Sequence, residues 1–134
     1  MKECGWETER LPKLPESVLR PGDLDGLLSV PEGLVGFEWE TGNISSSHRA
    51  VNKLLLTLLH GGIRGGILVV LGQAMRPHVT DRVGNITELR CYFPLWQAID
   101  YEEGALRVIA VEHDELSLEA PRIPKGTDGW ALGV

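Results

Sequence analysis

The strongest structural pattern of the chain lies in residues 23–53, DLDGLLSVPEGLVGFEWETGNISSSHRAVNK. It predicts a strand over 22–30, a turn at 31–33, a second strand over 34–40 and a helix over about 47–60. Residues 67–72, ILVVLG, form a short apolar run bounded by glycines, which is typical of a central strand in a covered sheet. Strand, helix and strand in this order predict a right-handed parallel crossover.

The flanking sequence fits a single α/β domain of 134 residues, with a central mixed β-sheet flanked by helices. Residues 1–20 look like an irregular lead-in, 21–113 form the core, and 114–134 form a loop-rich tail. A helix is expected over 86–99, with a capping-box start at Asn85–Glu88 and a kink or break at Pro94. The last strand is expected over 104–114.

Several protein classes are excluded by composition. The chain has no apolar run of 18 residues, so no membrane span is predicted, and its first residues lack the apolar segment of a signal peptide. Cys4 and Cys91 match no metal or redox spacing and are expected to be free thiols. We therefore expect a cytoplasmic protein.

Charge is distributed unevenly along the chain. The net charge is −6, which by itself disfavours a nucleic-acid binder. Residues 41–90, however, hold six Lys and Arg side chains against Asp81 and Glu88. A positive segment that directly follows a cluster of acids suits a phosphodiester substrate, because the acids can hold a metal and the cations can hold phosphate. The alternative is that these charges are simply spread over solvated faces.

Three carboxylates carry the main functional signal. Asp25 lies near the start of the first predicted strand, and Glu38 and Glu40 end the second. Alternation along a strand puts Glu38 and Glu40 on one face, roughly 6–7 Å apart at Cα. Like charges so placed repel unless a cation or a proton intervenes, and Mg²⁺ prefers such an oxygen pocket. Asp23 is a rival for the first acid, and exposed, solvated acids are the simpler alternative.

This pattern, continued by EWETGNISSSHRAVNK, TDRVGN, YFPLW, VEHD and PRIPKGTDG, resembles the PD-(D/E)XK nuclease superfamily. Within it, the chain is similar to bacterial type II restriction-endonuclease-like proteins whose third catalytic position holds Glu or Gln instead of Lys. The resemblance implies a DNA substrate, Mg²⁺ (with Mn²⁺ possible) as cofactor, and a homodimer acting on double-stranded DNA.

Carried over by position, Asp25 and Glu38 are the metal ligands, and Glu40 stands where most members have Lys. Glu40 can serve as general base or extra ligand, or Lys53 from the helix can supply the missing ammonium. The candidates for DNA contact are Asn43, Ser46, His48, Arg49, Arg82 and Lys125.

Three functions remain open from the sequence. The first is a Mg²⁺-dependent restriction-type DNA endonuclease. The second is a catalytically weak or inactive DNA-binding domain that keeps the nuclease fold, which the absent Lys and the acidic balance favour. The third is a small α/β binding module unrelated to nucleic acid, in which the carboxylates form a Ca²⁺ site or a surface cluster.

Overall fold

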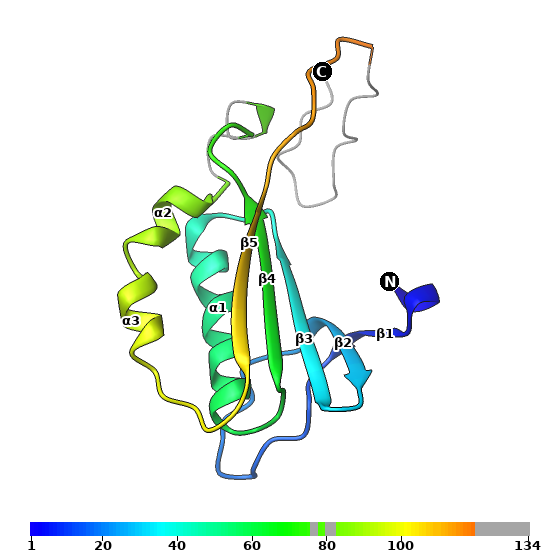
Figure 1. Cartoon of the computed structure of the whole chain (residues 1–134), viewed down its shortest axis with the longest axis vertical. Coiled ribbons are helices and arrows are strands. Elements are labelled where there is room, and N and C mark those ends of the chain that lie inside the picture. Colours follow the sequence, from blue (N-terminus) through cyan, green and yellow to red (C-terminus); the bar gives the residue numbers. More distant parts are fainter. Residues whose placement is uncertain (76–77, 80–82, 120–134) are drawn as a thin grey trace.

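A five-stranded mixed sheet with helices along one face forms the core of this computed structural model, which describes residues 1–75, 78–79 and 83–119 (Figure 1). The strands are β1 (Trp6–Arg10), β2 (Leu24–Val30), β3 (Gly33–Glu40), β4 (Gly65–Leu71) and β5 (Ala105–Val111), and they lie in that order across the sheet. β1, β2 and β3 pair antiparallel, whereas β3, β4 and β5 pair parallel. The predicted α/β class, mixed sheet and parallel crossover are therefore confirmed.

The prediction of an irregular lead-in over residues 1–20 is wrong for its first half. A short 3-10 helix, η1 (Lys2–Cys4), leads into β1, which pairs with β2 from Trp6 opposite Leu28 to Arg10 opposite Leu24. The Trp6 ring packs edge-on against Phe37, with centroids 5.6 Å apart. Because WETER is short and mostly charged, its strand formation depends on this edge pairing rather than on its own apolar pattern.

Helix α1 (Ile44–Leu59) connects β3 to β4 and covers the sheet. It begins three residues earlier than predicted, because Asn43, which precedes Ser45, Ser46 and Ser47, caps it: Oδ1 of Asn43 accepts the N–H of Ser46 at 3.1 Å. Apolar residues at helical spacing predict a core-facing stripe along this helix, and Val51, Leu54, Leu55 and Leu58 of that stripe are buried. Leu59, which also belongs to that spacing, is the last residue of the helix and is 48% exposed.

Two short helices replace the long one expected over 86–99. α2 (Ile86–Arg90) has the predicted capping box, in which the Asn85 side chain accepts the N–H of Thr87 and Glu88 accepts the N–H of Asn85. α3 (Phe93–Gln97) carries Pro94 in its first turn, so the chain breaks just before this proline, which lacks the N–H needed inside a helix. The last strand stops at Val111, and residues 112–119 contain no helix or strand.

The core lies between the sheet and α1. It consists of buried aliphatic side chains from β2, β4 and α1, together with Leu89 and Trp96 from the short helices. Gly36 of β3 lies directly under α1: a Cβ there would come within 2.8 Å of Leu24 and 3.2 Å of Leu54. This close approach brings the end of β3, with both glutamates, against the first turns of α1. Among the described residues, no helix is long and apolar enough to cross a membrane.

Candidate active site

Glu38 is a buried carboxylate at the centre of the site. Only 1% of the residue is exposed, because it follows Gly36 on the face of β3 that α1 covers. Its Oε1 lies 2.5 Å from the Lys53 ammonium, which projects from α1. A charged group so deeply buried needs a partner or a proton, and Lys53 is the cation that the fold supplies.

Lys53 is held at both sides of its ammonium group. Besides Glu38, Nζ contacts the backbone carbonyl of Asp23, to which it donates a hydrogen bond of 2.9 Å. The Lys53 side chain is 13% exposed. Sequence patterns did not predict this second anchor, since a backbone carbonyl just before a strand leaves no signal in residue identity.

Asp25 lies where β2 and β3 separate. The regular pairing of these strands ends at Gly26 opposite Phe37, and beyond it Oδ2 of Asp25 accepts the N–H of Trp39 at 2.8 Å. Trp39 is the residue between Glu38 and Glu40, so the aspartate lies beside both glutamates. The carboxylate of Asp23 instead faces Arg20 at 3.8 Å, which supports Asp25 over Asp23 as the acid of the site.

Burial and mutual repulsion raise the proton affinity of both glutamates. Burial raises the pKa of Glu38 from 4.5 to about 7; Lys53 opposes this shift, whereas the charges of Asp25 and Glu40 add to it. The pKa of Glu40 is also raised, first by burial and then by the charge of Asp25, while Lys53 and Arg49 oppose the shift. The three carboxylates therefore act on one another electrostatically.

The donor chemistry of the site fits a hard divalent cation, but the expected convergence is incomplete. All three candidate donors are carboxylates, the ligands that Mg²⁺ prefers. Within residues 1–75, 78–79 and 83–119, however, no three His, Cys, Asp or Glu side chains are close enough together to hold an ion. One carboxylate oxygen of Glu38, Oε1, is in contact with the Lys53 ammonium.

The residues predicted to contact DNA lie in different surroundings in the structure. Asn43 caps α1, and the ring of His48 packs edge-on against Tyr92 with centroids 4.4 Å apart, so both residues also have contacts within the fold. Arg49 is exposed and close enough to Glu40 to affect its pKa. Ser46 lies against Gly42, in the turn after β3. Arg82 and Lys125 lie outside the described residues.

One further carboxylate, Glu112, was not singled out from the sequence. It accepts the N–H groups of Ala74 at 3.3 Å and Met75 at 3.0 Å, and so fixes the turn after β4. It fits there because Gly72 has no side chain: a Cβ would lie 1.8 Å from Oε1 of Glu112. These contacts give Glu112 a structural role.

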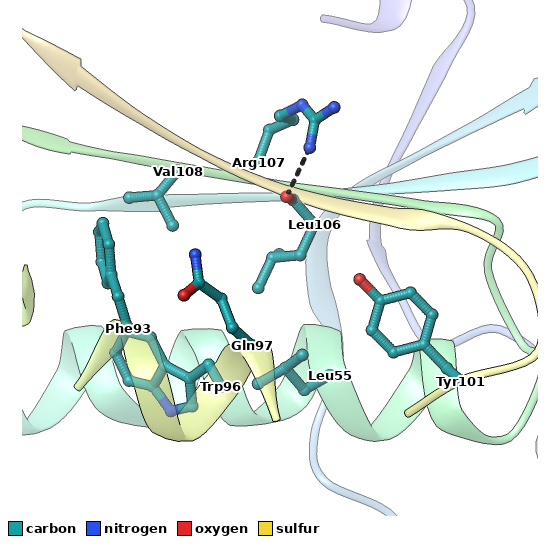
Figure 2. A pocket seen from close by; sticks show the side chains of 8 residues that line it. All are labelled: Leu55, Phe93, Trp96, Gln97, Tyr101, Leu106, Arg107 and Val108. Carbon is teal, nitrogen blue, oxygen red and sulfur yellow. Dashed lines mark hydrogen bonds between the residues drawn. The ribbon is translucent and has the colours of Figure 1, made fainter. Parts of the chain in front are cut away.

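A separate cavity of about 190 Å³ lies between α1, α3 and β5 (Figure 2). Its lining is largely apolar, with the polar ends of Gln97 and Tyr101 among aliphatic and aromatic side chains. None of the three carboxylates lines it. This cavity is therefore separate from the three carboxylates near the end of β3.

Comparison with known proteins identifies the family of the chain. The family model described as "Restriction endonuclease BamHI" matches residues 1–130. The type II restriction enzyme OkrAI of Oceanobacter kriegii is 41% identical over 132 residues, which are 98% of this chain and 68% of that enzyme. The type II restriction enzyme BamHI of Bacillus amyloliquefaciens is 42% identical over 97 residues, 72% of this chain and 43% of that enzyme. The chain thus spans about two thirds of one relative and less than half of the other. With nearly its whole length matched by the family model, the chain belongs to the BamHI family of restriction endonucleases.

Proposed function

We propose that this protein is a Mg²⁺-dependent DNA endonuclease of restriction type, which hydrolyses phosphodiester bonds at the end of β3. The proposal depends on the burial of Glu38, which is 1% exposed and lies beside Asp25 and Glu40. The membership of the chain in a family of restriction endonucleases supports it. A partly buried cluster of three acids costs stability, and a metal-dependent active site is a reason to keep it.

Asp25 and Glu38 are the proposed metal ligands. When bound, the divalent cation would activate a water and stabilise the charge that develops on the phosphate oxygens. Glu40, with its raised pKa, is the proposed group next to the attacking water, where it can accept a proton. Lys53 is the alternative occupant of the third catalytic role. Mn²⁺ would suit the same oxygen ligands.

Double-stranded DNA is the proposed substrate, bound by a homodimer so that each site cuts one strand. Arg49 is the best supported DNA contact, because it is exposed at the start of α1, close to Glu40. Asn43, Ser46 and His48, from the same turn and helix, together with Arg82 and Lys125, complete the proposed DNA-contact set.

Plasmid cleavage tests this proposal. Purified protein with Mg²⁺ should convert supercoiled plasmid to nicked and linear forms, and Glu38→Ala should lose at least about a hundredfold of that rate. Glu32→Ala is the matched control, since Glu32 is an exposed glutamate in the turn before β3. This variant should cleave plasmid at the rate of the unmodified chain. Equal cleavage by Glu38→Ala would remove the assignment.

A second candidate is a DNA-binding domain that keeps the fold but cuts weakly or not at all. It is favoured by the ion pair of Lys53 with Glu38 and by the incomplete convergence of the acids in the described residues. Salt-sensitive DNA affinity without nicking in Mg²⁺ or Mn²⁺ would support this candidate over the nuclease.

A further inference from the structure

We propose that the Lys53 ammonium is the built-in cation of the metal-free site, and that it and a divalent metal compete for Glu38. This inference rests on the proposed function and deepens it. It assigns Lys53 to the control of metal binding, whereas the catalytic alternative places the same ammonium beside the metal during cleavage.

The contacts of Lys53 support competition rather than coexistence. Its Nζ lies 2.5 Å from Oε1 of Glu38 and 2.9 Å from the carbonyl of Asp23, so one end of the carboxylate already has a cation at contact distance. The Glu38 side chain is 2% exposed, which leaves little room for a second cation. Two positive charges at contact distance in a poorly hydrated site repel strongly.

In the metal-free protein the Lys53 ammonium partly neutralises the negative charge of the three acids. Asp25, Glu38 and Glu40 repel one another, and Lys53 is the cation in contact with the most buried of them. The lysine stem has four flexible carbons, so the ammonium can leave Glu38 while α1 keeps its place. Because the charge of Lys53 also acts on Glu40, a displaced ammonium has a second carboxylate nearby.

The proposal makes opposite predictions for stability and for metal affinity. In Lys53→Met, which keeps the apolar stem and removes the charge, the metal-free protein should unfold at a lower temperature. The same variant should bind Mn²⁺ more tightly, by roughly tenfold, because one charge-assisted contact no longer has to be broken. Calorimetric titration with Mn²⁺ in the absence of DNA measures this affinity, and thermal unfolding in EDTA measures the stability.

Two further variants distinguish an error in the proposed metal site from an error in the proposed competition by Lys53. Lys13→Met removes an exposed lysine and should leave Mn²⁺ affinity unchanged. Glu38→Gln should weaken Mn²⁺ binding; if it does not, the proposed metal site is itself wrong. If Glu38→Gln weakens binding but Lys53→Met binds Mn²⁺ as the unmodified chain does, or more weakly, the metal site stands and competition by Lys53 is overturned.

A measurement on the unmodified chain covers the case in which Lys53→Met does not fold. Lysine acetylation, read by peptide mass spectrometry, should modify Lys53 more slowly than the exposed Lys13 in EDTA. Saturating Mn²⁺ should raise the rate at Lys53 relative to Lys13 severalfold, since the ammonium is released from Glu38. A ratio that Mn²⁺ does not change would overturn the proposal.

Discussion

Glu38 is a single residue whose burial lowers the stability of the folded protein above its ordinary pKa. Its burial under α1 raises its pKa from 4.5 to about 7 even with Lys53 in contact, so between these pH values the folded protein holds a proton that the unfolded chain has released. Buried acids whose pKa is shifted this far by desolvation and neighbouring charges are concentrated at functional sites, which agrees with the proposed active-site role of Glu38.

Stability of the metal-free protein should therefore depend on pH through Glu38. Since the folded-state pKa is raised from 4.5 to about 7, the folded state binds more protons between these values, and stability falls as pH rises through that window. Glu38→Gln removes this dependence, so the free energy of unfolding of the variant should rise relative to the unmodified chain by on the order of 3 kcal/mol from pH 4.5 to pH 7.5. Urea unfolding in EDTA at several pH values measures the difference.

The control for this pH series is Glu32→Gln, whose exposed side chain should leave the pH profile unchanged. Glu40 shifts in the same direction as Glu38 and is present in all three proteins, so it does not account for a difference between them. Parallel curves for Glu38→Gln and the unmodified chain would contradict the raised pKa.

At the scale of elements, the approach of β3 to α1 positions the site. Gly36→Ala would place a Cβ 2.8 Å from Leu24 and 3.1 Å from Ile63, inside the core. Because a packed core does not absorb an extra carbon without shifts, we expect a loss of about 1–3 kcal/mol in the free energy of unfolding. Gly65→Ala on the neighbouring strand is the control: its Cβ would meet Val35 at an ordinary 3.4 Å. Equal effects of the two substitutions in urea unfolding would contradict this packing.

The start of α1 gives a second prediction at this scale. Asn43→Ala removes the side chain that accepts the N–H of Ser46, so it should cost about 1 kcal/mol of stability. Ser45→Ala changes an exposed position two residues later and should cost less than half of that. Chemical denaturation compares the two, and a larger loss for Ser45→Ala would mean that the serine run, not Asn43, caps the helix.

Sequence patterns predicted the elements well where their own periodicity is strong. The β2–β3 pair, α1 and the parallel crossover to β4 follow from alternation, helical spacing and a continuous apolar run. β1 was missed because its pairing with β2 comes from tertiary structure rather than from its five residues. The break in the α2–α3 segment could be anticipated at Pro94 but not placed to the residue.

The site was only partly predictable for a related reason. The placement of Glu38 and Glu40 on one face of β3 follows from the two-residue period of a strand. The hydrogen bond that the Asp25 carboxylate accepts from the Trp39 N–H depends on where two strands separate. The hydrogen bond that Lys53 donates to the Asp23 carbonyl depends on how α1 crosses the sheet. Such contacts join residues distant in sequence, and no local pattern encodes them.

For the whole molecule, the balance of charge should set how DNA is held. The net charge of −6 opposes binding, so affinity depends on the cations of residues 41–90. We expect DNA affinity to fall steeply with salt, and Arg49→Ala to reduce the slope of log affinity against log salt concentration by about one. Fluorescence anisotropy with a labelled duplex in EDTA measures both slopes, with Arg10→Ala on β1 as the control. An unchanged slope in Arg49→Ala would remove Arg49 from the DNA-contact set.

Asp25 and Glu38 are the residues proposed to hold a divalent cation at the end of β3. A crystal structure with Mn²⁺, read by its anomalous signal, tests this directly. We predict one Mn²⁺ in contact with carboxylate oxygens of Asp25 and Glu38, with the Lys53 ammonium moved off Glu38. A map with Mn²⁺ bound elsewhere, and with Lys53 still 2.5 Å from Glu38, would contradict the account.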